Sequence, residues 1–247
     1  MTPRCVLWSL VLSAAALLLP AASPAAALSV SPVRVHLSAQ EPTAVVTLRN
    51  GGGTTSVVQV EALLWEQVDG EDRLTATRDV IVSPAVFTVA DGKSQLVRLS
   101  LRKAPDATRE LSYRLILQEV PSAEAVQPSG LRVALRMSLP IFVAPQTEAV
   151  PELRWAAACC EGDALALEVT NTGTRHVRVT DFALTTTDGA IPIAGQQLAA
   201  YVLPGQSRRW LLKPQVADLT GLAAARVALT GHTEDGPVTA EIPVAGP

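Results

Sequence analysis

The sequence has few of the residues that most catalytic and metal sites require. Its 247 residues include only three cysteines, three histidines and 4% aromatic side chains. The histidines, His36, His176 and His232, lie far apart and lack metal-ligand spacing, which makes each of them an ordinary surface or strand residue. The sequence has no GxSxG nucleophile elbow, no phosphate-binding glycine loop and no cysteine–histidine arrangement that would activate a thiol. We therefore expect no catalytic residue, no metal site and no cofactor.

The cysteines also exclude a disulfide framework. Cys5 lies in the N-terminal segment described below, which leaves the adjacent pair Cys159 and Cys160. Adjacent cysteines form a disulfide only through a strained ring, so we expect two thiols or a local redox pair, and a bond between them stays open. The four cysteine ligands of a structural zinc site are absent.

No basic block is present. The 20 Lys and Arg residues and 23 Asp and Glu residues are spread along the chain, and the formal net charge is -3. Attraction to nucleic acid or to an anionic membrane surface is weak at this charge. The sequence therefore predicts neither as a partner.

The one long apolar run lies at the N-terminus. Residues 1–27 carry a positive charge at Arg4, an apolar run from Val6 to Leu19 and small residues up to Ala27. This order is typical of a cleaved secretory signal peptide. No later segment approaches the roughly 20 apolar residues of a transmembrane helix. We expect an exported protein that begins near Leu28 and does not insert into a membrane.

The rest of the chain lacks a long segment with the helical period of about 3.6 residues and alternates between apolar and polar residues instead. Apolar side chains recur at every second position in residues 58–64, for example. Asp-Gly pairs, which suit hairpin turns, recur between such segments at residues 69–70, 91–92, 188–189 and 235–236. The pattern predicts an all-β protein.

A proline-bounded stretch without periodicity, residues 144–151, divides the β pattern in two. We place a domain boundary there, with an N-terminal domain of residues 28–145 and a C-terminal domain of residues 146–247. Each has the size and the strand number of an immunoglobulin-like sandwich.

The most regular alternation in the chain runs over residues 131–139 and ends at Pro140. Its apolar side chains share one face: Leu131, Val133, Leu135, Met137 and Leu139. An ordinary edge strand that packs on its own sandwich would have this pattern. A strand donated to another sheet would have it too, because a strand edge offers unpaired amides and carbonyls to a partner. The pattern by itself does not decide between these readings.

A series of short stretches resembles the PapD-like periplasmic pilus chaperones, and more specifically the archaic branch of the chaperone–usher pathway. In chain order these are residues 30–35 (VSPVRV) with Asn50, 65–70 (WEQVDG), 83–84, 92–98, 113–115, 118–121, 139–143, 171–173 and 203–206 with Trp210. Each stretch alone is weak evidence for the resemblance. Their order and spacing over the mature chain carry the resemblance.

The resemblance implies a periplasmic chaperone made of two immunoglobulin-like domains in a boomerang, which binds one pilus (fimbrial) subunit at a time. Such subunits lack their last strand, and residues 131–139 match the chaperone strand that fills the gap, with the apolar face named above inserted into the subunit. The resemblance also implies delivery to an outer-membrane usher without nucleotide. Self-association of the free chaperone through the same strand is a further expectation.

The family holds the C-terminal carboxylate of the subunit with basic residues in the cleft between the domains. Arg34 matches the first of these positions, and a guanidinium suits bidentate capture of a carboxylate. The lysine usual near the end of the donor strand is replaced by Pro140. We therefore expect a different second anchor, and Arg114 on the preceding strand is the candidate.

Two other functions remain as alternatives. An exported two-domain immunoglobulin-like binding or adhesion module would expose aromatic or polar clusters on its loops, whereas only 4% of the residues are aromatic. An exported hydrolase would need a catalytic constellation that the sequence does not contain.

Overall fold

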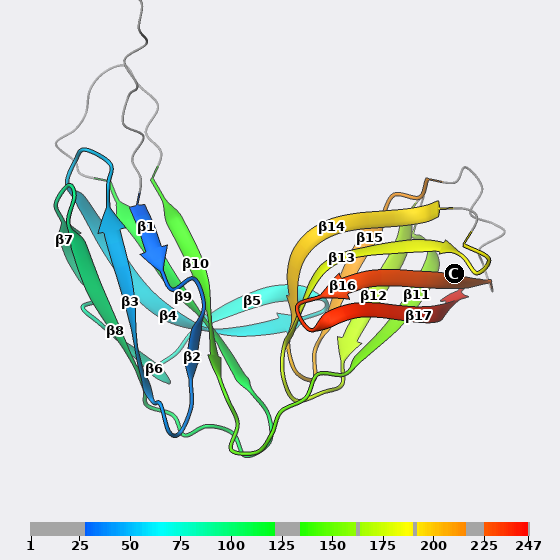
Figure 1. Ribbon diagram of the computed structural model, residues 1–247, viewed down its shortest axis with the longest axis horizontal. Helices are drawn as coiled ribbons and strands as arrows, with labels where there is room; N and C mark the ends of the chain where they lie inside the picture. The colour runs from blue at the N-terminus through cyan, green and yellow to red at the C-terminus, as the bar shows by residue number, and fades with distance from the viewer. Residues whose placement is uncertain (1–27, 122–133, 162–163, 190–191, 216–224, 247) are drawn as a thin grey trace, which may run out of the picture.

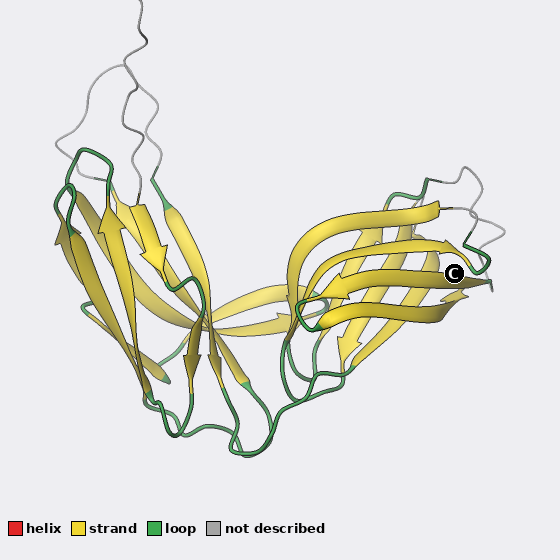
Figure 2. Cartoon of the chain, in the orientation of Figure 1, coloured by secondary structure: helices red, strands yellow, loops and turns green. Residues whose placement is uncertain are grey.

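The computed structural model describes residues 28–121, 134–161, 164–189, 192–215 and 225–246. In these residues the chain forms strands β1 to β17 and no helix (Figure 2). The all-β prediction is confirmed. Among the same residues, no helix of the length and hydropathy needed to cross a membrane is found.

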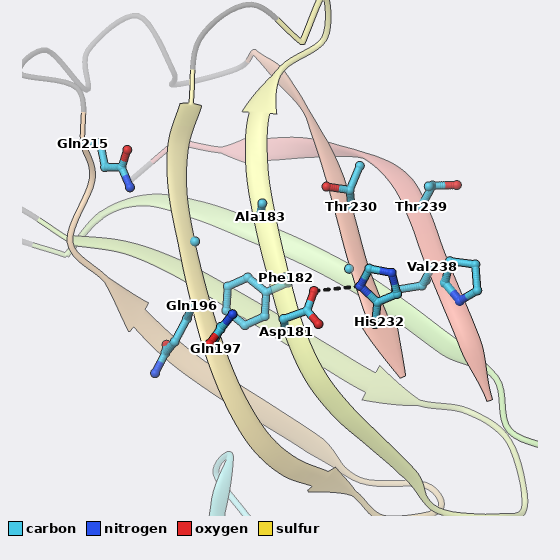
Figure 3. Close-up of a pocket in the computed structure, with 13 residues that line it drawn as sticks. Asp181, Phe182, Ala183, Gln196, Gln197, Gln215, Thr230, His232, Val238 and Thr239 are labelled. Atoms are coloured by element: carbon cyan, nitrogen blue, oxygen red, sulfur yellow. Dashed lines mark hydrogen bonds and ion pairs between the residues drawn. The ribbon is translucent and has the colours of Figure 1, made fainter. Parts of the chain in front are cut away.

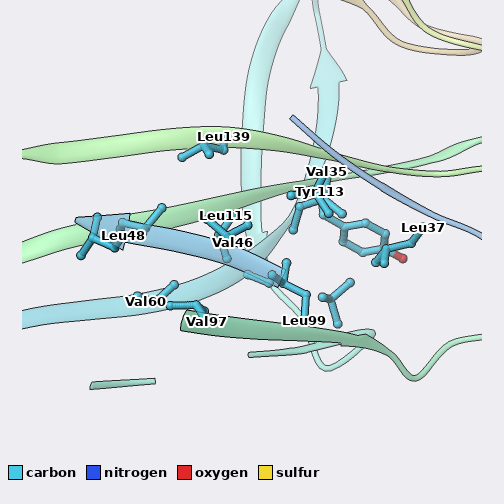
Figure 4. Close-up of a cluster of buried hydrophobic side chains, with 14 of the residues drawn as sticks. Val35, Leu37, Val46, Leu48, Val60, Val97, Leu99, Tyr113, Leu115 and Leu139 are labelled. Atoms are coloured by element: carbon cyan, nitrogen blue, oxygen red, sulfur yellow. The ribbon is translucent and has the colours of Figure 1, made fainter. Parts of the chain in front are cut away.

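The N-terminal half is a sandwich of two sheets. Its strands are β1 (Leu28–Ser31), β2 (Val35–Leu37), β3 (Thr43–Asn50), β4 (Ser56–Val68), β5 (Glu71–Ala76), β6 (Val80–Ser83), β7 (Val86–Val89), β8 (Ser94–Leu101), β9 (Leu111–Val120) and β10 (Arg136–Val143). One sheet has the order β1-β3-β8-β6, and the other has the order β2-β10-β9-β4-β5, with β7 paired to β4. The strand alternation turns Leu48, Val97 and Leu115 into the space between the sheets, where they are fully buried (Figure 4).

The C-terminal half is built around a core of its own. Its strands are β11 (Leu153–Glu161), β12 (Ala164–Asn171), β13 (Val177–Thr186), β14 (Pro192–Val202), β15 (Ser207–Leu212), β16 (Arg226–Thr233) and β17 (Gly236–Ala245). The strands pair in the order β14-β13-β16-β17-β11-β12-β15 around this core. A short parallel pairing joins β11 and β17 in the middle of that order. Phe182, Leu167 and Val227 are buried inside it.

Cys159 lies in this second core, with only 3% of its surface exposed. It is disulfide-bonded. Of the possibilities that the sequence left open, the free thiol at Cys159 is therefore excluded. Because it is buried among aliphatic side chains, Cys159 contributes to packing rather than to an exposed reactive site.

The two halves form a boomerang, with an angle between them (Figure 1). The hairpin of β4 and β5 reaches from the N-terminal half to the C-terminal half. Strand β4 serves both regions because its side chains alternate: Val58 and Val60 enter the N-terminal core, whereas Trp65 and Gln67 contact the C-terminal half. The contact between the two halves is therefore formed in part by side chains of β4 that point away from the N-terminal core.

Candidate functional site

Two arginines from the N-terminal half lie around one tyrosine of the C-terminal half. Arg34 precedes β2, Arg114 lies on β9 and Tyr201 lies on β14. The guanidinium carbons of Arg34 and Arg114 are 5.5 Å and 5.8 Å from the centre of the Tyr201 ring. The fold thus brings both arginines singled out from the sequence into one site between the two halves.

Arg34 is an ion-paired cation. Its Nη1 donates a hydrogen bond of 2.8 Å to Oε2 of Glu234, and its Nη2 donates one of 2.8 Å to the hydroxyl of Tyr201. Burial alone would lower the pKa of Arg34, but the contacts with Glu234 and Tyr201 raise it above its ordinary value. Arg34 therefore joins the two halves and carries a charge that is already balanced.

Arg114 is in a different state. Its guanidinium lies flat over the Trp65 ring, 3.6 Å from the ring centre, and no ion pair with another residue of the described part of the chain is present. Burial lowers the pKa of Arg114, and the more distant Asp72 and Tyr201 oppose this shift. A stacked, half-buried cation without a carboxylate partner is a good receptor for an anion.

An aromatic cluster supports these cations. Trp65, Phe142 and Leu203 are fully buried together, with Tyr201 packed at their edge. The Tyr201 ring meets Trp65 edge-on at 5.6 Å and lies 5.4 Å from Phe142. Sequence analysis did not single out Phe142 or Tyr201. The alternation of residues 139–143 could have indicated Phe142. Its side chain points to the face opposite Ile141, which belongs to the N-terminal core, and so joins the cluster between the halves.

A buried histidine lies close to Glu234, the ion-pair partner of Arg34. His176 is 3% exposed, and its ring stacks on Phe142 at 3.5 Å. Its Nδ1 is 2.6 Å from Oε1 of Glu110, and its Nε2 is 3.3 Å from Oε1 of Glu234. The expectation of an ordinary surface or strand residue is wrong for His176, because two carboxylates and a ring from distant parts of the chain enclose it. Nearby, burial together with the charges of Arg34 and His176 lowers the pKa of His36.

Hydrogen bonds from the β4–β5 hairpin fix the two halves against each other. The Gln67 side chain donates to the carbonyl of Tyr201 at 2.7 Å and accepts from the amide of Leu203 at 3.0 Å. Asp72 accepts from Trp65 Nε1 at 3.0 Å and pairs with Arg208 at 2.7 Å. These bonds hold Trp65, and therefore Arg114 above it, in a defined position.

One edge of β10 is open beside this site. Residues 136–143 pair with β9 on one side, but on the other side β2 pairs only with residues 141–143. Residues 136–140 therefore have no second strand partner in the part of the chain that the structure describes. Their free amides and carbonyls are available to an added strand.

The predicted donor side chains are distributed differently from the sequence expectation. Leu131 and Val133 lie outside the described residues. Leu135 is half-buried, and Met137 packs partly against the N-terminal core. Leu139 is only 4% exposed and belongs to that core (Figure 4). In this structure the Leu139 side chain is therefore packed within its own half.

A second pocket, of about 510 Å³, lies on the C-terminal half between β13, β14, β16 and β17 (Figure 3). Asp181 accepts a hydrogen bond of 3.0 Å from His232, which lowers the pKa of the Asp181 carboxyl. Both side chains are open to solvent. Glutamine amides and threonine hydroxyls form most of the remaining polar surface of the pocket, and no group of three or more potential metal ligands occurs among the described residues.

Comparisons with known proteins agree with this architecture. Residues 27–148 match the family model for pili and flagellar-assembly chaperones, PapD N-terminal domain. No curated protein sequence matches the chain.

The solved structures that resemble the chain cover nearly all of it. The CsuC chaperone, in its complex with the tip subunit CsuE from the archaic chaperone–usher Csu pili of Acinetobacter baumannii, has a TM-score of 0.67 and 24% identity over 89% of this chain and 99% of that chain. The YadV chaperone has a TM-score of 0.58 and 18% identity over 87% and 98%. The SafB chaperone, in complex with the SafA pilin of Salmonella enterica, has a TM-score of 0.57 and 17% identity over 87% and 95%.

Proposed function

This chain belongs to the PapD-like pilus-assembly chaperones, and we propose that it binds incomplete pilus subunits in the periplasm by donating a strand to them and then delivers them to an outer-membrane usher. It acts by binding alone, without catalysis and without a cofactor. CsuC and SafB are each described in complex with a subunit, which supports a pilus subunit as the partner of this chain. The similarity to CsuC supports a role in an archaic-type pathway.

The observation that carries the proposal is the open edge of β10 over residues 136–140. A subunit strand that pairs there extends the sheet by backbone hydrogen bonds, and the side chains before Arg136 then face the subunit. Burial of two or three large aliphatic side chains contributes about 3–9 kcal/mol before the costs of ordering and association. The side chains that insert into the subunit are therefore Leu131, Val133 and Leu135. Met137 contacts both the core of the subunit and the N-terminal core of the chaperone.

Arg114 and Arg34 fix the register in which the subunit strand pairs with β10. Arg114 lies opposite Pro140 on β9, at the last residue of the open edge. A subunit whose C-terminal carboxylate binds Arg114 thus begins its pairing at the end of this edge, and each of its side chains acquires a fixed position along β10. Arg34, whose guanidinium carbon is 5.5 Å from the centre of the same Tyr201 ring, is the second cation of the proposed anchor.

Co-expression with the pilus subunit encoded beside the chaperone tests the proposal. The native chain should retain the subunit in a one-to-one complex during affinity purification. Leu135→Asp should abolish retention, because it places a charge on the donor face. Thr43→Asp, which introduces the same charge at an exposed position of β3 in the other sheet of the same half, is the matched control and should retain the subunit.

Two outcomes would contradict the proposal. Equal retention by the native chain and Leu135→Asp would exclude donor-strand binding. Failure of the native chain to retain any subunit would favour the alternative of an exported two-domain binding or adhesion module.

A further inference from the structure

The carboxylate of Glu234 forms an ion pair with the guanidinium of Arg34. Glu234 lies in the turn between β16 and β17, 200 residues away along the chain, and its Oε2 is 2.8 Å from Nη1 of Arg34. Tyr201 takes Nη2 at the same distance of 2.8 Å. Both terminal nitrogens of Arg34 therefore already donate a hydrogen bond, and a carboxylate that binds them end-on in bidentate fashion must compete with Glu234 and Tyr201.

Arg114, the second cation of the site, has no carboxylate partner of this kind among the described residues. Arg114 stacks on Trp65 and has no ion pair within the described residues. The two arginines face the same Tyr201 ring, at 5.5 Å and 5.8 Å from its centre. An incoming carboxylate thus meets one cation that is available and one that is already neutralised.

We propose that Glu234 is an internal substitute for the subunit carboxylate: it occupies Arg34 in the free protein, and a subunit that binds both arginines must displace it. The inference rests on the proposed function and adds to it a competitor built into the C-terminal half. Two carboxylates beside one guanidinium repel each other, so the arrival of one weakens the hold on the other. Glu234 therefore lowers the affinity for every ligand that uses Arg34 through a carboxylate.

Glu234 has a second partner to which it can turn. Its other oxygen, Oε1, is 3.3 Å from Nε2 of His176, yet this buried nitrogen makes no hydrogen bond in the present geometry. A buried nitrogen without a partner is costly, so a rotation of Glu234 away from Arg34 that aligns its carboxylate with Nε2 of His176 would give this nitrogen the hydrogen bond that it lacks. His176 is already held by Glu110 at 2.6 Å and does not need to move.

The exchange is local. Gln67 and the Asp72–Arg208 pair join the two halves independently of Glu234. Displacement of Glu234 therefore changes the charge available at Arg34 while the hairpin continues to fix the angle between the halves.

The test measures binding of two synthetic peptides to the full-length mature chaperone. Both have the sequence of the C-terminal strand of the pilus subunit encoded beside the chaperone; one ends in a free carboxylate and the other in an amide. Glu234→Gln should bind the carboxylate peptide about 5-fold or more tightly than the native chain does, and the amide peptide equally well. Glu241→Gln is the matched control, because Glu241 pairs with Arg226 on an exposed part of the C-terminal half. It should leave both affinities unchanged.

A double-mutant cycle separates competition from a structural effect. In an Arg34→Gln background, Glu234→Gln should no longer alter the affinity for the carboxylate peptide. Should Glu234→Gln lose its cooperative melting transition, Glu234→Asp, which keeps the charge but shortens the side chain, gives the same comparison and should also tighten binding of the carboxylate peptide.

Different failures have different meanings. An equal gain for both peptides, or a gain that persists without Arg34, would overturn the competition while leaving the chaperone function intact. An unchanged affinity for the carboxylate peptide in a native chain that retains the subunit would do the same. If the native chain retains no subunit and binds neither peptide, the proposed function itself fails.

Discussion

Pro140 on β10 lies directly opposite Arg114 on β9 in the antiparallel register of the N-terminal sheet. Pro140 has no amide hydrogen to donate, and the next residue, Ile141, begins the pairing with β2. The open edge of β10 thus ends at the position where the stacked cation lies. Under the proposed function, Arg114 would mark the end of the donated strand in place of the usual lysine.

Loss of the Arg114 charge should weaken subunit binding. We expect Arg114→Gln to reduce affinity about 10- to 100-fold, since a charge-assisted hydrogen bond to a half-buried partner is lost. The affinity of Arg114→Lys should lie between those of the native chain and Arg114→Gln. The ammonium keeps the charge, but it does not stack on Trp65 in the same way and does not bind a carboxylate in bidentate fashion. Titration calorimetry with a purified subunit measures both. Arg154→Gln, on an exposed pair with Glu152, is the control, and an equal loss there would contradict the anchor.

Gln67 should contribute to stability through the contact between the halves. Gln67→Ala removes the acceptor of the Leu203 amide and the donor to the Tyr201 carbonyl, and we expect it to destabilise the protein by about 1–3 kcal/mol. Urea unfolding followed by tryptophan fluorescence checks this, because Trp65 lies at the same contact. Gln197→Ala, at an exposed position, should change the free energy of unfolding by less than about 0.5 kcal/mol. Similar values for the two variants would show that Gln67 does not hold the halves together.

The tip of the β4–β5 hairpin requires glycine for reasons of space as well as conformation. Gly70 has a φ of 80°, and a Cβ there would lie 2.9 Å from Cβ of Arg209 in the C-terminal half. Gly92 has a φ of 70° with nothing within 4 Å, which makes it a matched control for backbone strain. Gly92→Ala should destabilise by about 1 kcal/mol, and Gly70→Ala by clearly more. Thermal unfolding of both variants tests this; equal shifts would mean that the hairpin tip can move away from Arg209 at no cost.

His36 should make stability depend on pH in the acidic range. Burial, Arg34 and His176 lower its pKa in the folded state, whereas the unfolded chain keeps a value of about 6.5. Above that pH both states are neutral. As the pH falls below it, the unfolded state binds the proton first, so the folded state loses stability. The native chain should therefore lose more stability between pH 7.5 and pH 5.5 than His36→Gln does. Urea unfolding at the two pH values measures the difference, and parallel losses would exclude His36 as a cause.

Local patterns in the sequence determined the strands and several turns. The period of two in residues 58–64 gave β4 its two faces, because successive side chains of a strand point in opposite directions. The Asp-Gly pairs lie at turns as expected: Gly70, Gly92, Gly189 and Gly236 all have positive φ values. Arg34 and Arg114 were predicted as site residues from the resemblance alone, since no local pattern distinguishes them from other arginines.

The tertiary structure alone decided the partners of those residues. Arg34 meets Glu234 across 200 positions and Tyr201 across 167, and His176 is buried between two carboxylates that come from different halves. Leu139 has the same place in the alternation as Leu135, yet it enters its own core, where it pairs with Leu115 of β9 and lies close to residues 141–143, which pair with both β2 and β9. Periodicity encodes which face of a strand a side chain takes. What covers that face depends on how distant strands pair and how the two halves meet, and these contacts arise only when the whole chain has folded.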